Sequence, residues 1–366
     1  MFLEGNSNMK SRSLLLLSLS LAVVSLGTAA NAGTYKNPLS TLVDPNADAD
    51  PRLLTGLDGK FYLYYPQGTR IAVFESKDLI NWTAPLGAGN ANAVLRSSDV
   101  TTPNSGFWAE GAYAAGGTYY LYYTLVQSGT KSIGVATSTS PLGPFADKGL
   151  VVAGTASHGF RDPFVFRNPD TDKIFIYFSD GGNALLGQEL CSAVSPCGAN
   201  TKPTRLLTGS SAFTMLSLSD ADHQDWEYID LEHPTIFYAA NADASHRFYL
   251  MYNGAGGALG RYAIGYAYSA SPRGPFTRAP AAPAGTCGGG MNPMVCQHQT
   301  PGVYGPGSPS TVVDDAGTRY LIYRIKTTAA ESWSDRRTQV DMLYRNEHDE
   351  LLITPTIHTP NPVPEL

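Results

Sequence analysis

Ile133-Gly-Val-Ala-Thr-Ser-Thr-Ser-Pro-Leu-Gly-Pro-Phe145 returns further along the chain as Ile264-Gly-Tyr-Ala-Tyr-Ser-Ala-Ser-Pro-Arg-Gly-Pro-Phe276, with nine of the thirteen positions identical. A match of this length indicates an internal repeat. A unit made of short strands and turns cannot bury its own faces, so neighbouring units must pack against one another. The repeat therefore predicts an all-β fold built from several similar units.

Five aromatic and aliphatic runs predict how many units there are. Each run has the composition of a strand, and their centres lie between 55 and 74 residues apart. The runs are residues 61–65, 119–123, 174–178, 248–252 and 320–324. Radial closure of five such units protects the sheet edges, so we expect a five-bladed β-propeller with about four strands per blade. A double-sheet sandwich suits the composition but not the period of about 60 residues.

Composition agrees with strands and turns in a single large domain. The 366 residues include 37 Gly, 25 Pro and 21 Tyr, and no charge block or Pro-rich linker divides residues 33–366. We interpret this segment as one propeller-shaped domain. The net charge of −6 disfavours nucleic acid as a partner.

The first 32 residues resemble a secretory signal peptide. Lys10 and Arg12 precede an apolar run at residues 14–26, and Ala30-Asn31-Ala32 provides small residues for cleavage. A membrane anchor is the alternative, but the run is shorter than the roughly 20 residues that a spanning helix needs. We therefore expect a secreted or periplasmic protein that has no membrane partner once the signal is removed.

Four cysteines follow in two close pairs, Cys191 with Cys197 and Cys287 with Cys296. In an exported chain these pairs are typical of two short-loop disulfides, although three pairings are possible in principle. A zinc site is the alternative, and the absence of C-x-x-C spacing disfavours it.

Acidic residues precede four of the aromatic runs. Asp50 lies in Ala-Asp-Pro, Asp162 in Arg-Asp-Pro and Glu232 in Glu-His-Pro, while Glu110 precedes the second run. The first strand of each propeller blade faces the centre, so we expect these carboxylates to converge. Burial and like charges raise the pKa of some clustered carboxyls, which supplies the acid and the base of glycoside hydrolysis. Asp-Pro is also a common turn dipeptide, so each residue alone has a structural alternative.

Three quoted stretches carry a resemblance to glycoside hydrolase family 43. They are Ala49-Asp50-Pro51, Ser76-Lys-Asp-Leu-Ile-Asn-Trp82 and the Ser-Pro-Leu-Gly-Pro-Phe element, and the likeness covers most of residues 37–355. The resemblance implies a five-bladed propeller that hydrolyses glycosidic bonds with inversion. It also implies Asp50 as the base, Glu232 as the acid and Asp162 as the residue that tunes and orients the acid. Inversion requires about 6.5 to 9.5 Å between the acid and base carboxyls, so that a water fits.

Five further residues are candidates for substrate contact. Trp108 resembles a family element and has a ring suited to stacking on a sugar, or else to the core. Arg161 and His233, beside the proposed acids, are suited to sugar contacts or to holding the channel wall. Arg336 falls where the family often has a sugar-binding arginine, although the adjacent Arg337 blurs the match. Glu110 replaces the proline of the family's usual Trp-Ala-Pro element, which here reads Trp108-Ala-Glu110.

Ser308 marks a second departure from the family. Many members have Gly-Pro-Gly-His at the start of the last blade, with the His near a central calcium or water cluster, whereas this chain has Gly305-Pro-Gly-Ser308. We therefore expect no required cofactor, with a structural calcium in doubt, and we predict no metal ligands.

The resemblance implies a pentose-containing polysaccharide or oligosaccharide, such as arabinan or arabinoxylan, as the substrate of a monomeric enzyme. A related hydrolase acting on galactan or fructan is one alternative. Fructan-cleaving relatives carry Asn-Asp-Pro-Asn-Gly and Glu-Cys where this chain has Ala-Asp-Pro-Arg and Glu-His, which disfavours them. A non-catalytic carbohydrate-binding propeller is the alternative from another class.

Overall fold

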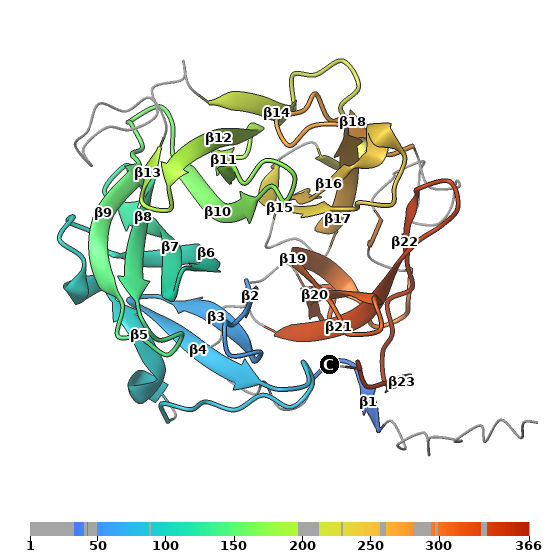
Figure 1. Cartoon of the computed structure of the whole chain (residues 1–366), viewed down its shortest axis with the longest axis horizontal. Coiled ribbons are helices and arrows are strands. Elements are labelled where there is room, and N and C mark those ends of the chain that lie inside the picture. The colour runs from blue at the N-terminus through green and yellow to red at the C-terminus, as the bar shows by residue number, and fades with distance from the viewer. Residues whose placement is uncertain are drawn as a thin grey trace, which may run out of the picture. The chain divides into compact units, whose positions relative to one another are not determined.

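Five antiparallel sheets are arranged around a common centre in the computed structural model of the chain, which confirms the predicted five-bladed propeller (Figure 1). The structure describes residues 33–39, 42, 50–87, 89–196, 212–227, 230–256, 261–280, 294–296, 299–330 and 335–365. The predicted signal peptide at residues 1–32 lies outside this set. None of the described helices has the length and apolar character needed to span a membrane.

The blades follow one another in chain order, each with its first strand innermost (Figure 1). Blade 1 consists of β2 (Arg52–Thr55), β3 (Phe61–Gln67), β4 (Arg70–Ser76) and β5 (Ala93–Arg96). Blade 2 consists of β6 (Gly106–Ala115), β7 (Thr118–Gln127), β8 (Thr130–Ser138) and β9 (Ala146–Val152). Blade 3 consists of β10 (Phe160–Arg167), β11 (Ile174–Asp180), β12 (Ala184–Ser192) and β13 (Ser195–Pro196), with β14 (Phe213–Ser217) also paired to β12.

The last two blades and the short elements complete the described chain. Blade 4 consists of β15 (Glu232–Tyr238), β16 (Phe248–Gly254), β17 (Ala263–Ser269) and β18 (Thr277–Arg278). Blade 5 consists of β19 (Tyr304–Val313), β20 (Arg319–Lys326), β21 (Arg336–Arg345) and β22 (Leu351–Ile353). Four 3-10 helices lie between strands, η1 (Gly89–Asn92), η2 (Ser97–Asp99), η3 (Asp225–Glu227) and η4 (Ala244–His246). Outside the blades, β1 (Thr34–Lys36) pairs with β23 (Pro360–Pro362).

The aromatic runs form the second strand of each blade, and both of their faces are buried. Tyr62 and Tyr64 of β3 belong to a core cluster with blade 2, whereas Leu63 and Tyr65 belong to a cluster with blade 5. Successive side chains on a strand point to opposite faces, so a strand with a neighbouring blade on each side needs apolar residues at every position. Three further clusters fill the remaining blade interfaces in the same way.

The thirteen-residue repeat adopts the same local structure in blades 2 and 4. The Gly143 amide donates to the Ser140 carbonyl at 3.1 Å, and the Gly274 amide donates to the Ser271 carbonyl at 3.0 Å. Both copies end on a buried phenylalanine in the core. The identical positions therefore encode the exit from the third strand of a blade.

The cysteine prediction falls partly outside the described residues. Neither Cys191 nor Cys296 is a free thiol. Their predicted partners, Cys197 and Cys287, are not described. The two short-loop pairings therefore stay a prediction.

The innermost strands are interrupted where they reach the candidate site. β10, β15 and β19 each have a register shift at a residue that precedes proline. These residues are Asp162, His233 and Ser308, with φ of 59°, 51° and 55°. Proline has no backbone N–H for the ladder, and a left-handed residue bends the strand, so both features re-aim the neighbouring side chains.

Arg52 reaches from blade 1 to all four other blades. It is 2 % exposed, and its Nε donates to the Glu110 carbonyl at 3.0 Å. Its Nη1 donates to Thr235 Oγ1 at 2.9 Å and to the Pro309 carbonyl at 3.4 Å. The guanidinium also lies 5.4 Å from the ring centroid of Phe164, within the range of a cation–π contact. One buried side chain therefore ties blade 1 to blades 2, 4, 5 and 3.

Replacing Arg52 with Met should lower the free energy of unfolding by about 3 kcal/mol, because it leaves buried acceptors without their donor. Urea denaturation measures this loss. Arg167→Met is the matched control, since Arg167 is partly exposed and pairs with Asp172 at the surface. Equal midpoints for the two variants would contradict a central role for Arg52.

Candidate active site

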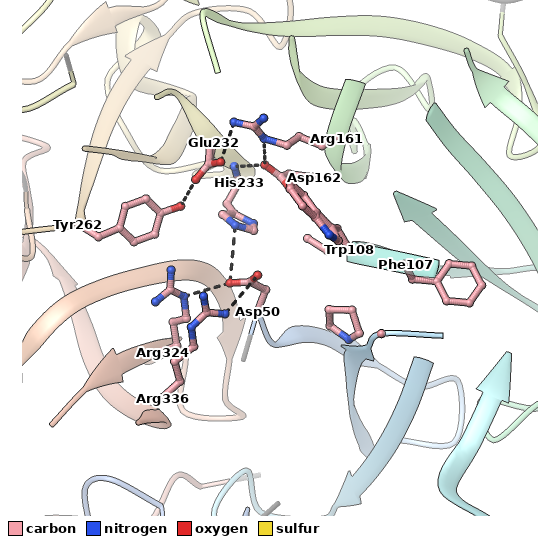
Figure 2. A pocket seen from close by; sticks show the side chains of 13 residues that line it. Asp50, Phe107, Trp108, Arg161, Asp162, Glu232, His233, Tyr262, Arg324 and Arg336 are labelled. Carbon is pink, nitrogen blue, oxygen red and sulfur yellow. Dashed lines mark hydrogen bonds and ion pairs between the residues drawn. The ribbon is translucent and has the colours of Figure 1, made fainter. Parts of the chain in front are cut away.

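A cavity of about 380 Å³ opens where the inner strands are interrupted. Figure 2 shows carboxylates, arginines and aromatic rings gathered around it. It is lined by Asp50, Pro66, Gly68, Phe107, Trp108, Ala109, Arg161, Asp162, Glu232, His233, Tyr262, Arg324 and Arg336. All three predicted acids and four of the five predicted contact residues are therefore brought together.

Asp50 lies among positive charges. Arg324 Nε is 3.0 Å from Asp50 Oδ1, Arg336 Nη1 is 3.7 Å from Oδ2, and Ser308 Oγ donates to Oδ1 at 2.6 Å. Burial raises the pKa of the Asp50 carboxyl, but the charges of Arg336, of His233 in its protonated form at low pH, and of Arg324 outweigh burial and hold the pKa well below its ordinary value. Asp50 is therefore ionised throughout the neutral range.

His233 packs against Asp50 as a neutral ring. Its Nε2 is 3.7 Å from Asp50 Oδ1, and the side chain is buried. Burial lowers the pKa of His233 to about 4, although the nearby charges of Asp50 and Glu232 act in the opposite direction. Near neutral pH the arginines therefore keep Asp50 ionised. In Figure 2 the His233 ring lies between Asp50 and Glu232.

Glu232 is held by different partners. Arg161 Nη2 is 2.7 Å from Glu232 Oε1, and the Tyr262 hydroxyl donates to Oε2 at 2.6 Å. The ring of Tyr262 lies against Gly307, where an added Cβ would be 2.3 Å from a ring carbon. Burial, followed by the charge of Glu232, raises the pKa of Tyr262 well above its ordinary value, so this hydroxyl stays a donor.

Asp162 lies beside Arg161 in the buried wall of the cavity. Arg161 Nε is 3.6 Å from Asp162 Oδ2, and the backbone amide of His233 donates to the same oxygen at 3.4 Å. Burial raises the pKa of Asp162 to about 6; Arg161 opposes the shift, and the charge of Asp50 adds to it. Asp162 thus titrates near the lower end of the neutral range.

The arrangement separates two kinds of carboxyl across one cavity. Asp50 is fixed as an anion by two arginines and a serine. Glu232 shares its single arginine with Asp162 and also accepts from a tyrosine. An ionised carboxylate can accept a proton from water, and a carboxylic acid can donate one to a leaving oxygen. These are the two proton transfers of glycoside hydrolysis.

A family model matches most of the chain. The model for glycosyl hydrolases family 43 aligns with residues 35–350. The chain belongs to glycosyl hydrolases family 43.

Two curated relatives of this family 43 chain have names that refer to arabinan. A probable arabinan endo-1,5-alpha-L-arabinosidase B of Aspergillus fumigatus is 31 % identical over 143 residues, which cover 38 % of this chain and 37 % of the relative. The extracellular endo-alpha-(1->5)-L-arabinanase 2 of Bacillus subtilis is 25 % identical over 253 residues, 62 % of this chain and 49 % of the relative. The chain thus spans between about a third and a half of the length of these curated relatives.

Solved structures share the family 43 fold. The crystal structure of a thermostable family-43 glycoside hydrolase has a TM-score of 0.71 at 23 % identity, and the match covers 91 % of this chain and all of that one. An endo-arabinase from Bacteroides thetaiotaomicron has a TM-score of 0.61 at 17 % identity, covering 84 % and 98 % of the two chains. At these identities the likeness concerns the fold.

Glu110 is the predicted contact residue that does not line the cavity of this family 43 chain. A bulge in β6 between Trp108 and Glu110 turns Ala109 toward the cavity and leaves Glu110 fully buried. Neither carboxyl oxygen has a hydrogen-bond partner among the described residues. Burial raises the pKa of Glu110 well above its ordinary value, against the effect of Arg52.

The three acids do not occupy equivalent positions in their strands. Asp50, Asp162, His233 and Ser308 each directly precede a proline that lies in, or just before, the inner strand of their blade. Glu232 stands one residue earlier, at the position that Arg161 occupies in blade 3. The blade-to-blade pattern predicted from sequence is therefore correct for convergence but shifted by one residue for Glu232.

The predicted contact residues differ in exposure. Trp108 is 47 % exposed at the cavity, and Lys131 Nζ lies 4.1 Å from the centroid of its ring, so Trp108 is not a core residue. Arg336 is buried beside Asp50, whereas Arg337 is exposed, which resolves the ambiguity between these neighbours.

Sequence reasoning missed Tyr262 and Arg324, and it noted Ser308 only as a departure. Tyr262 precedes β17, and Arg324 lies in β20, a second strand of aromatic type. The charge of Arg324 inside an otherwise apolar run was a signal available in the sequence.

The surroundings of Ser308 do not suit a calcium ion. Its hydroxyl donates to Asp50, and the guanidinium of Arg324 contacts the same carboxylate oxygen. A cation there would face positive charge. Within the described part of the chain, no group of three or more His, Cys, Asp and Glu side chains is placed to hold a metal.

Asp162→Asn should change the pH dependence of stability. The folded pKa of about 6 exceeds the ordinary value of 3.8, so the carboxyl contributes stability below about pH 4 that is lost as the pH rises to 6. The uncharged amide loses nothing over this range. Between pH 4 and pH 7 the free energy of unfolding of the variant, relative to that of the wild type, should therefore rise by about 2 kcal/mol. Urea denaturation at several pH values measures the gain, and a constant difference would contradict the assignment.

Proposed function

We propose that this chain is a secreted glycoside hydrolase that cleaves pentose-containing polysaccharide, arabinan or arabinoxylan, with inversion of configuration. The observation that carries the proposal is that two carboxyls lining one cavity have different charged and hydrogen-bonding partners. Asp50 is held as an anion by Arg324 and Arg336, whereas Glu232 is held by Arg161 and Tyr262. Membership of family 43 supports the reaction type.

In this proposal Asp50 is the general base. A water between Asp50 and the anomeric carbon gives one proton to the carboxylate as its oxygen attacks. The Ser308 hydroxyl and Arg324 both contact Oδ1, and the more distant Arg336 approaches Oδ2, which fixes the orientation of the carboxylate. The fixed anion needs no reorganisation when the water attacks.

Glu232 is the general acid in this proposal, and it gives its proton to the leaving glycosidic oxygen. Asp162 reaches the acid through their common partner Arg161, so ionised Asp162 draws the guanidinium away from Glu232. That competition favours the protonated form that the acid needs. Asp162 is therefore a positioning residue rather than a proton donor.

The substrate class and the location rest on the relatives. The curated proteins quoted above are named for arabinan, and the Bacillus subtilis relative is named extracellular. The exposed ring of Trp108 at the cavity supports a sugar as the ligand, because aromatic faces pack against sugar rings.

Asp50→Asn and Glu232→Gln should each lower kcat/KM on arabinan by about 10²- to 10⁴-fold, because each removes one proton transfer. On an aryl arabinofuranoside with an acidic leaving group Glu232→Gln should lose much less, since that group departs without a proton. A panel of arabinan, arabinoxylan, aryl arabinofuranosides and aryl xylosides provides the measurement. Asp172→Asn, a surface carboxylate, is the matched control. Undiminished hydrolysis by both variants would refute the catalytic assignment and leave the binding-propeller alternative.

The first product released should have the anomeric configuration opposite to that of the substrate. A single displacement by water inverts the anomeric carbon, whereas a covalent glycosyl-enzyme intermediate retains its configuration. Proton NMR in the first minutes of hydrolysis distinguishes them before mutarotation. A retained configuration would overturn the inverting mechanism but not the choice of carboxyls.

A further inference from the structure

Asp230 is a further carboxylate that contacts Arg161, the arginine that holds the proposed acid Glu232. Arg161 Nη2 is 2.6 Å from Asp230 Oδ1 and 2.7 Å from Glu232 Oε1. The Nε of the same guanidinium is 3.6 Å from Asp162. The guanidinium of Arg161 therefore contacts three carboxyl groups, and its contact with Asp230 is the shortest of the three.

The fold holds Asp230 in this place. The Leu231 amide donates to the Gly182 carbonyl at 2.7 Å, and Ser179 Oγ donates to the Leu231 carbonyl at 2.6 Å. Gly182 has a φ of 85°, and an added Cβ would lie 1.5 Å from Asp230 Oδ1. The turn between β11 and β12 thus leaves room that the carboxylate of Asp230 fills. The hydrogen bond from Leu231 to this turn also fixes the residues that lead into β15.

We propose that Asp230 is a positioning residue for the acid Glu232, acting by competition for Arg161. This inference rests on the proposed function, in which Glu232 donates a proton. While Asp230 is ionised it attracts Arg161 Nη2 and repels negative charge on Glu232, so both effects keep the proton on the acid. Without that charge Arg161 would pair fully with Glu232 and favour its ionised form.

The charges that face Asp230 come from three strands. Arg161 and Asp162 lie on β10, Glu232 on β15 and Lys131 on β8. Burial raises the pKa of Asp230 to about 7, and the charge of Glu232 adds to the shift against the effect of Arg161. Asp230 and Glu232 therefore oppose each other's ionisation, so that a charge on one disfavours a charge on the other.

The test is the pH dependence of kcat/KM for Asp230→Asn. The basic limb should move to lower pH by about half a unit or more, because the charge that opposes ionisation of the acid is gone. KM at pH 5 should change less than about twofold, since Asp230 does not line the cavity. Asp230→Glu should restore the limb toward the wild-type position. Asp172→Asn, which breaks a surface pair with Arg167, should leave the profile in place.

A basic limb at the wild-type position, or a uniform loss of kcat/KM at every pH, would overturn the proposal. Asp230→Ser repeats the test if the Asn variant does not fold, and failure of both to fold would assign Asp230 a structural role instead. Asp50→Asn and Glu232→Gln keep the two proposals distinguishable. If those variants lose activity while Asp230→Asn keeps its profile, the proposed function stands and only the role of Asp230 fails.

Discussion

The contacts made by the buried guanidinium of Arg52 hold the inner strands of the five blades together at the centre of the propeller. Blades in a ring contact only their neighbours through apolar side chains, so the centre needs another means of fixing blades that do not touch. Arg52 supplies it with hydrogen bonds to blades 2, 4 and 5 and a cation–π contact to blade 3. Asp50 is two residues away on the same backbone. The contacts of Arg52 therefore also fix the position of the proposed base, Asp50, relative to the other inner strands.

Unequal distribution of arginines then gives similar carboxyls different protonation. Arg324 and Arg336 both contact Asp50, whereas Asp162, Asp230 and Glu232 share their contact with Arg161. A carboxyl beside two cations is favoured in its ionised form, and neighbouring carboxyls that share one cation oppose each other's ionisation. The acid–base asymmetry that we propose for catalysis thus follows from counting charges in a buried space.

Left-handed residues before proline place these side chains, at a cost. Asp162, His233 and Ser308 have positive φ, which costs on the order of 1 to 3 kcal/mol for each residue without a compensating structure. Each lies at a register shift in an inner strand, which is paired with the well-packed second strand of the same blade. Strain of this kind is found at functional sites, and here it turns the innermost strands toward one cavity.

Local patterns in the sequence predicted the strands, the five blades and the convergence of Asp50, Asp162 and Glu232, because strand periodicity and X-Pro turns are encoded within a few residues. The sequence did not predict which side chains from distant parts of the chain contact one another. The pairing of Arg324 with Asp50 joins blade 5 to blade 1, which only closure of the ring brings together, and Tyr262 meets Glu232 through the pairing of strands within blade 4. Glu110 shows the same limit at a smaller scale. A single bulge at Ala109 decides which side chains of β6 reach the cavity, since a shift of one residue reverses the face of a strand, and that bulge exists only in the paired sheet.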